Sequence, residues 1–112
     1  NENIADISGF RAAYTALFEE RLKPLVLEME DPATDLLSYK RQFFVAYAQV
    51  WCAASNHNAE ARYIASSVHS TSEYRVNQVV QQHPDFQQVF GCSRFASSEP
   101  LCSTFGAVGH QT

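Results

Sequence analysis

The chain has 112 residues, of which 46% are hydrophobic and 18% are charged, so it is at most one domain and its composition excludes a disordered chain. Twelve acidic residues against eight basic ones give a net charge of −4, which argues against non-specific nucleic-acid binding, because that needs a basic surface. No apolar run approaches the ~18 residues of a transmembrane helix, and no basic-then-apolar secretion signal is present.

The first predicted element is an amphipathic helix over residues 1–22. Apolar residues recur at helical spacing from Ile7 onwards. Lys23-Pro24 ends or bends this helix, because proline has no amide hydrogen to donate. The sequence starts at Asn1 without an initiator methionine, so we expect a processed chain or a fragment of a longer protein.

A second helix is expected over residues 36–55, after an acidic loop at 28–35 in which Thr34 or Asp35 is the candidate N-cap. From 43 to 54 only one residue is plainly polar. A helix that is apolar all round is typically buried in protein. A chain this short offers few elements to surround it. Either the domain is an unusually efficient bundle, or most of the burying partner lies outside the chain.

Shorter helices follow along the chain. One is expected over residues 59–67. Ser70 and Glu73 have the spacing of a capping box, which predicts a helix over 69–82 with Ser70 as its N-cap.

The last predicted helix begins at Pro84, a residue favoured in a first helical turn, and ends near Gly91. Residues 92–112 are rich in serine and glycine and are expected to form an extended tail. No internal repeat and no alternating strand pattern is present, so the predicted fold is all-α.

The three cysteines, Cys52, Cys92 and Cys102, are an odd number and cannot all pair within the chain. They are too far apart for the short Cys pairs of structural zinc sites. Two interpretations stay open, which are free thiols in a cytosolic protein and disulfides to cysteines outside the chain. The place of Cys102 in the serine- and glycine-rich tail favours the disulfides.

Two carboxylates lie on the apolar side of the first helix. Glu2 and Asp6 are four residues apart, so they share one helix face, and Asp6 falls within the apolar stripe. Neither has a Lys or Arg three or four residues further on, and a buried carboxylate costs several kcal/mol without a counter-charge. Either these are ordinary acids of a fraying first helical turn, or they form a cation site in which one binds a metal and the other orients a neighbouring ligand.

Three of the four histidines are expected at the surface in polar surroundings: His57, His83 and His110. His69 is different, because it directly precedes the expected N-cap Ser70, and Arg75 lies about one turn into the same helix. A histidine and an arginine near one helix start can hold a developing oxyanion and a substrate carbonyl or carboxylate. The alternative is a surface histidine beside a solvated arginine.

Four segments of the sequence match, in the same order, the motifs of one enzyme family. They are Asn1-Glu2-Asn3-Ile4-Ala5-Asp6, Phe43-Phe44 with Tyr47-Ala48-Gln49-Val50-Trp51-Cys52, Val68-His69-Ser70 with Tyr74-Arg75-Val76, and Pro84-Asp85-Phe86 with Phe90 and Cys92. They resemble the Glu-Asn-Ile-Ala-Asp, Phe-Phe-x-x-Phe-Ala-Gln-Val-Trp-Cys, Val-His-Ser-Pro-x-x-Tyr-Arg-Val and Phe-x-x-x-Phe-x-Cys motifs of the neprilysin-like zinc metalloendopeptidases. The resemblance runs from residue 1 to about 102. Thr71 departs from the usual Pro, Ser8 from the usual Gly, and Phe105 from the usual final Trp.

The resemblance implies a role for each matched residue. Glu2 would be the third zinc ligand, Asp6 would orient a zinc-bound histidine, His69 would stabilise the tetrahedral transition state, Arg75 would bind a backbone carbonyl of the substrate, and Val50 and Trp51 would help line the pocket for the large apolar residue just after the cleaved bond. It also implies that Cys52, Cys92 and Cys102 pair with cysteines upstream of this segment.

The family's His-Glu-x-x-His motif, which supplies two zinc ligands and the general base, lies upstream of the Glu2 motif and does not occur in these 112 residues. A catalytic zinc of this kind needs three protein ligands and a water. We therefore expect the isolated chain neither to hold catalytic zinc (Zn2+) nor to cleave peptides. The expected partners are the upstream part of the same peptidase domain and peptide substrates, in a secreted or membrane-anchored parent that faces the cell exterior.

Two other classes of protein stay open. One is a catalytically dead relative kept for peptide binding, or a stand-alone secreted helical module. The intact set of Glu2, Asp6, His69 and Arg75 speaks against such decay. The other is an intracellular helical protein with free thiols.

Overall fold

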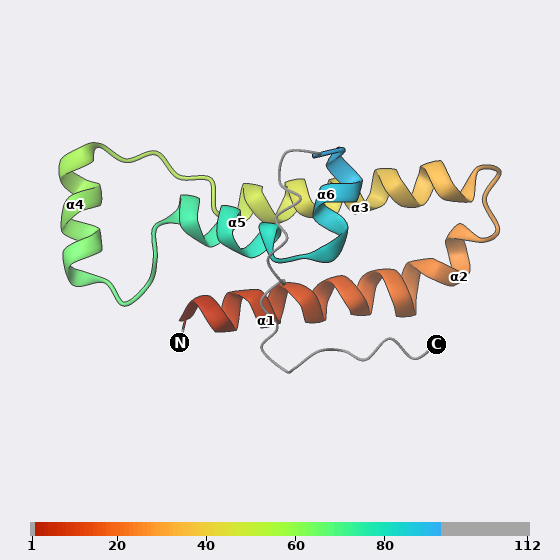
Figure 1. The fold of residues 1–112 in the computed structure, drawn as a ribbon, viewed down its shortest axis with the longest axis horizontal. Helices are drawn as coiled ribbons and strands as arrows, with labels where there is room; N and C mark the ends of the chain where they lie inside the picture. Colours follow the sequence, from red (N-terminus) through yellow and green to blue (C-terminus); the bar gives the residue numbers. More distant parts are fainter. Residues whose placement is uncertain (1, 93–112) are drawn as a thin grey trace.

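The structure is a computed structural model that describes residues 2–92. Within this range all regular structure is helical, which confirms the all-α prediction. In chain order the elements are α1 (Glu2–Thr15), the π-helical stretch η1 (Ala16–Leu22), α2 (Lys23–Val26), α3 (Pro32–Val50), α4 (His57–Ser66), α5 (Ser72–Gln81) and α6 (Pro84–Phe90). Helices α1 and α3 run in opposite directions along the long axis, and α4 stands apart at one end (Figure 1).

The first helix continues past Pro24 because its turns widen before that residue. In an α-helix the proline ring would clash with the carbonyl four residues earlier. In η1 the backbone is π-helical, and the Lys23 N–H reaches back five residues to the Phe18 carbonyl. Wider turns of this kind relieve the clash. The chain thus stays helical to Val26, where α2 lies against α3.

Helix α3 begins four residues earlier than predicted, at Pro32, and ends five residues earlier, at Val50. The prediction of Thr34 or Asp35 as N-cap was wrong. Asp31 caps the helix, and its Oδ1 accepts a hydrogen bond from the Thr34 N–H at 3.3 Å. The reason is that proline at the first helical position loses no hydrogen bond, so the helix starts directly after Asp31.

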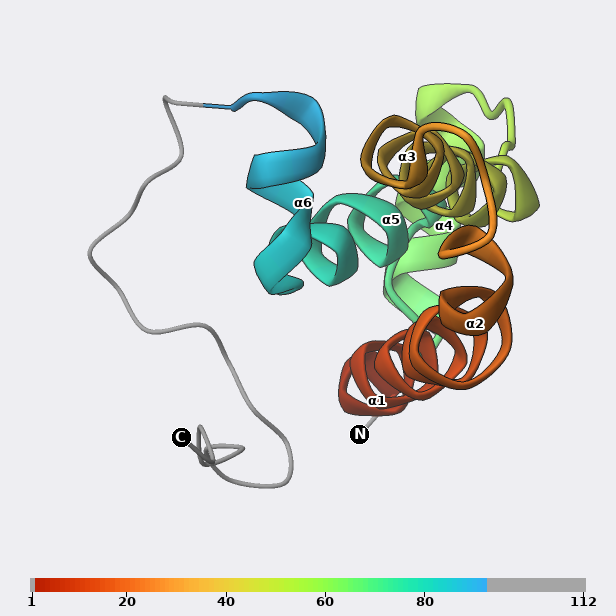
Figure 2. The same ribbon diagram turned by 90° about the vertical axis from the view of Figure 1, so that its right-hand side faces the viewer.

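The described residues do not bury this second helix all round. Phe44 is the one fully buried side chain of α3, and Val45 and Val50 are exposed. Helices α2, α5 and α6 lie against α3 on one side only, as the end-on view shows (Figure 2). Within residues 2–92, therefore, the chain is not an efficient bundle around α3.

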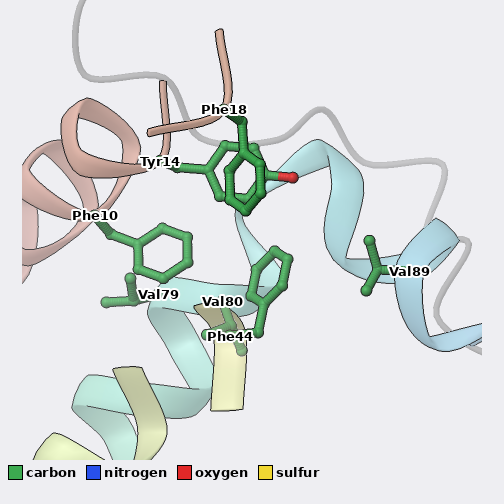
Figure 3. Packing of buried hydrophobic residues seen from close by; sticks show 7 residues of the cluster. All are labelled: Phe10, Tyr14, Phe18, Phe44, Val79, Val80 and Val89. Atoms are coloured by element: carbon green, nitrogen blue, oxygen red, sulfur yellow. The ribbon is translucent and has the colours of Figure 1, made fainter. Parts of the chain in front are cut away.

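Aromatic rings form the centre of the core. Its fully buried members come from α1, η1, α3, α5 and α6, and are Phe10, Tyr14, Phe18, Phe44, Val79, Val80 and Val89 (Figure 3). Phe10 meets Phe43 edge-on, with ring centroids 5.3 Å apart, and Tyr47 in the same way at 4.7 Å. Edge-to-face pairs of this kind add stability beyond the area that they bury. They fix α1 against α3.

The two short helices α4 and α6 lie close to their predicted positions, and α4 begins two residues earlier than expected and ends one residue earlier. α4 spans His57–Ser66, and the Asn56 side chain accepts the Ala59 N–H at 2.9 Å. α6 starts at Pro84 as predicted and ends at Gly91, whose φ of 65° is the left-handed geometry that favours glycine.

The capping-box prediction for α5 was wrong. The helix begins at Ser72, with Thr71 as its N-cap residue and no side-chain capping bond. The Ser70 hydroxyl instead donates to Oδ1 of Asn3 at 2.9 Å. The hydroxyl is thus used to tie the start of α5 to the start of α1, so it is not available to cap its own helix.

His83 is buried, so its expected surface position was wrong. Its side chain is 7% exposed, and its ring meets those of Tyr14 at 4.1 Å and Phe44 at 5.6 Å between centroids. Burial lowers the pKa of His83 to about 4. The local sequence around His83 is polar, but α1 and α3 close over the ring from far away in the chain.

Polar side chains adjoin this histidine. We call Tyr14, Lys40, His83 and Asp85 the buried cluster. Oδ2 of Asp85 accepts hydrogen bonds from the Tyr14 hydroxyl at 2.6 Å and from Lys40 Nζ at 2.5 Å. Burial alone would raise the pKa of Asp85, but the hydrogen bonds from Lys40 and Tyr14 hold it below its ordinary value. Burial, with the hydrogen bond to Asp85, raises the pKa of Tyr14. The cluster joins α1, α3 and α6.

Candidate functional site

The candidate site lies where the first turns of α1 meet the α4–α5 loop and the first turns of α5. Contacts between α1 and α5 fix this arrangement, and Figure 1 shows the start of α1 beside the start of α5. The hydrogen bond between Ser70 and Asn3 closes the same junction. Residues that are almost seventy positions apart in the sequence therefore face one another here.

Glu2 and His69 form the outer pair of the site. Nε2 of His69 lies 3.1 Å from Oε2 of Glu2. The Glu2 side chain is 45% exposed, and the His69 side chain is 39% exposed. The His69 backbone N–H bonds the Ser67 hydroxyl at 3.1 Å, which fixes the loop that carries the ring. Both side chains can therefore be reached from outside the chain.

Asp6 and Arg75 form the inner pair. Nε of Arg75 donates to Oδ2 of Asp6, and Nη2 donates to Oδ1, both at 2.7 Å. The side chains are only 13% and 16% exposed. These bonds hold the pKa of the Arg75 guanidinium above its ordinary value. The counter-charge that no nearby residue on α1 provides thus comes from α5, which explains how a carboxylate is tolerated in the apolar stripe.

We call Glu2, Asp6, His69 and Arg75 the open cluster. All four were singled out from the sequence, and the structure brings them together. Trp51 joins them, because the Arg75 guanidinium carbon lies 3.9 Å from the centroid of its ring. Val50 lies at the end of α3 and is 76% exposed.

Sequence reasoning missed one member of this neighbourhood, Tyr47. Its hydroxyl donates to the backbone carbonyl of Arg75 at 3.0 Å, and its ring lies 6.4 Å from that of Trp51. Burial, together with the charge of Asp6, raises the pKa of Tyr47. The signal was present in the sequence, since a tyrosine stands there in place of the phenylalanine of the resembled motif.

A shallow hollow of about 440 Å³ adjoins His69. Its lining comes from the end of α4, the α4–α5 loop and the start of α5, and comprises Ile64, Ser67, Val68, His69, Ser70, Thr71 and Tyr74. Ile64, Val68 and Tyr74 are exposed. The hollow has both apolar and hydroxyl-bearing walls, and no sequence pattern indicated it.

The cysteines lie outside the site. Cys52 is exposed and Cys92 is half-buried, and neither forms a disulfide within residues 2–92. Cys102, the tail beyond position 92 and His110 lie outside the described residues, so the predictions for them stay predictions. No helix within residues 2–92 combines the length and the apolar character needed to cross a lipid bilayer.

The site's donor chemistry fits a metal in part. The Glu2 carboxylate is a hard oxygen donor of a kind that zinc accepts, and its exposure lets an ion approach. Asp6 has both oxygens engaged by Arg75. Within the described range no three His, Cys, Asp or Glu side chains converge to hold an ion. Glu2 is thus the carboxylate of the open cluster that a metal ion can reach, and the described residues offer no complete set of ligands.

Comparison with known proteins relates nearly the whole chain to one family of peptidases. The model of Peptidase family M13 matches residues 1–102. The chain is 33% identical over 99 residues to Neprilysin-1 of Caenorhabditis elegans, which covers 88% of this chain and 13% of that protein. It is 36% identical over 100 residues to Membrane metallo-endopeptidase-like 1 of Mus musculus, covering 89% and 13%, and 32% identical over 99 residues to Neprilysin of Homo sapiens, covering 88% and 13%. No solved structure is significantly similar to it.

Proposed function

Because the chain belongs to peptidase family M13, we propose that it is the C-terminal part of the catalytic domain of a zinc metalloendopeptidase that hydrolyses small peptides. The observation that carries the proposal is the convergence of Glu2, Asp6, His69 and Arg75 at one junction of α1 and α5. The chain spans about 13% of the length of the curated relatives that it matches, so activity belongs to a longer parent.

Each side chain of the open cluster has a chemical task in this proposal. Glu2 would hold the zinc together with two histidines from outside the chain, and the ion would polarise the scissile carbonyl and activate a water. Asp6 is proposed to orient one of those histidines, although both of its oxygens bind Arg75 here. Its partial exposure leaves room for a further donor.

His69 and Arg75 supply hydrogen-bond donors to the substrate. The His69 ring is positioned by its loop and by Glu2, so an N–H can point at the oxygen where negative charge develops. Arg75 is proposed to bind a backbone carbonyl of the peptide through the nitrogen that Asp6 leaves free. Val50 and Trp51 are proposed to line the pocket for a large apolar residue after the cleaved bond.

The same proposal covers the isolated chain and its surroundings. With one zinc ligand and no general base, the chain alone is proposed to be inactive. We also propose that Cys52, Cys92 and Cys102 pair with cysteines upstream, and that the parent is secreted or displayed at the cell surface. The exposed face of α3 supports a partner segment, since apolar residues there lie open in the described part of the chain.

The experiment is zinc content and peptide cleavage, measured on the full-length parent. We expect one zinc per chain and zinc-dependent cleavage. Glu2→Gln should lose both, whereas Glu20→Gln, an exposed acid on the same helical run, should keep both. A folded parent that binds peptide but holds no zinc would favour the non-catalytic relative. Stoichiometric zinc on the isolated chain, removed by Glu2→Ala, would contradict the proposed inactivity of this segment.

A further inference from the structure

The Arg75 guanidinium is held on one edge and one face. Nε and Nη2 are committed to the two oxygens of Asp6 at 2.7 Å. A guanidinium is flat, and a bidentate carboxylate fixes the position of its two donating nitrogens. Nη1 has no hydrogen-bond partner among residues 2–92. It is therefore the nitrogen available to a ligand.

The second support is the Trp51 ring, which covers one face of the guanidinium. The distance from the Arg75 Cζ to the ring centroid is 3.9 Å, well within the range of a cation–π contact. Asp6 alone would let the group pivot about the carboxylate. With Trp51 against its face, the plane of the guanidinium has one orientation.

The third support is the Tyr47 hydroxyl. It donates to the Arg75 backbone carbonyl at 3.0 Å, in addition to the hydrogen bonds within α5. The Tyr47 ring is itself wedged between Trp51, at 6.4 Å, and Phe10, at 4.7 Å. The hydroxyl thus links the core of the protein to the backbone that carries Arg75.

We propose that Trp51 and Tyr47 are positioning residues that hold the Arg75 guanidinium so that Nη1 donates to a carbonyl of the bound peptide. Trp51 thereby has a role separate from lining a pocket. Tyr47, which had no role in the proposed function, now has one. The peptide carbonyl as the acceptor rests on the proposed function. The packing of Trp51 on Arg75 does not, so the two can be tested apart.

The packing is tested on the 112-residue chain, in which Trp51 is the only tryptophan. Arg75→Gln should uncover the ring, so the emission shifts to longer wavelength and acrylamide quenches it more. Arg62→Gln removes an exposed arginine on α4 and should leave both readings unchanged. Unchanged emission and quenching in a helical Arg75→Gln chain would overturn the proposal, whatever the parent's activity.

The positioning task is tested in the full-length parent by a double-mutant cycle. The substrate carries alanine after the cleaved bond, so that no large side chain reaches the apolar pocket. Trp51→Leu should lower kcat/KM by about 2- to 30-fold, the range of a cation–π contact. In an Arg75→Gln background the same change should have almost no effect, because its target is gone. Losses that multiply would show that Trp51 acts independently of Arg75 and would overturn the proposal.

Tyr47→Phe gives the mildest test, because it deletes only the hydroxyl. It should lower kcat/KM by roughly 2- to 10-fold, the range of one net hydrogen bond, and mainly through KM. Tyr39→Phe is the matched control on α3, since its hydroxyl bonds no residue in the described range. Equal behaviour of the two variants would overturn the role of Tyr47. If the parent cleaves no peptide even without a substitution, the proposed function is refuted. The fluorescence result still decides whether Trp51 packs on Arg75.

Discussion

The open cluster and the buried cluster are built from the same kinds of side chain. Each joins a histidine, a carboxylate and a cation beside aromatic rings, and each ties α1 to helices far along the chain. Their histidines differ in exposure, since His69 is 39% exposed and His83 only 7%. Their ion pairs do not follow this order, because Asp6 and Arg75 are 13% and 16% exposed while Lys40 and Asp85 are 22% and 27% exposed. The comparison teaches that residue types alone do not distinguish an accessible histidine from a buried one, because the elements packed around the ring decide its exposure.

Opening the buried cluster should have the largest effect. Phe44→Ala removes a ring that packs against His83 and is itself almost fully buried. We expect a loss of about 3–5 kcal/mol in the free energy of unfolding, from lost burial and the cavity left behind. Chemical denaturation followed by circular dichroism measures it. A loss below about 1 kcal/mol would mean that the ring cluster is not the centre of the core.

Breaking the inner pair of the open cluster comes next. Asp6→Ala leaves Arg75, which is 16% exposed, without its counter-charge. The expected loss is about 3 kcal/mol, at the lower end for a broken buried pair because some water reaches the guanidinium. Denaturation of Asp6→Ala beside Glu20→Gln, an exposed change expected to stay within about 0.5 kcal/mol, measures it. If the two variants unfold alike, the pair contributes nothing to stability.

Acidification should separate the two histidines. The pKa of His83 is about 4 in the folded chain, against 6.5 as its ordinary value, so the unfolded chain binds more protons between these pH values. Stability is therefore full above about pH 6.5 and falls as the pH drops towards 4, by about 2 kcal/mol between pH 7 and pH 5. At the start of α6 the His83 Nδ1 accepts a hydrogen bond from the Asp85 N–H at 3.3 Å. His83→Asn, which keeps an acceptor at this position, should flatten the slope. His69→Asn should leave it in place, and a slope that vanishes in His69→Asn instead would reverse the assignment.

The smallest expected effect is that of Tyr14→Phe, which removes one hydrogen bond to Asp85 from the buried cluster. The loss should be about 1.5 kcal/mol, since the acceptor is charged and partly buried. The variant should also lose the fall in stability that begins above about pH 10, where an unfolded tyrosine ionises but the buried Tyr14, with its raised pKa, resists. Tyr39→Phe serves as the control, and urea midpoints at pH 7 and pH 10.5 give both readings.

Much of the fold could be predicted because its signals are local. Pro84 and Gly91 bound α6 as expected, and the first segment is helical from Glu2. Its turns widen in η1, however, and it continues past Lys23-Pro24, where the sequence predicted an end or a bend. Asp31 and Ser70 show where this fails. In each case a second residue decides which side chain caps the helix. The proline after Asp31 sets the start of α3, and Asn3 of α1 accepts the hydrogen bond of the Ser70 hydroxyl.

The four residues of the open cluster could be singled out from the sequence, but their contacts could not. Asp6 was singled out because its place in an apolar stripe demanded a partner, yet nothing nearby indicated Arg75. Tyr47 and His83 were missed or misplaced for one physical reason. Their surroundings come from helices distant in sequence, and periodicity reports only on the helix that carries the residue.

We propose that the open cluster acts on substrate, whereas the buried cluster stabilises the fold. The most direct test measures kcat and the unfolding midpoint of the full-length parent with His69→Gln and with His83→Asn. We expect His69→Gln to lower kcat by about 10²–10³-fold with an unchanged midpoint, as for loss of an oxyanion donor. His83→Asn should lower the midpoint and leave kcat unchanged where the protein is folded. A loss of kcat in His83→Asn, or full activity in His69→Gln, would contradict these roles of the two clusters.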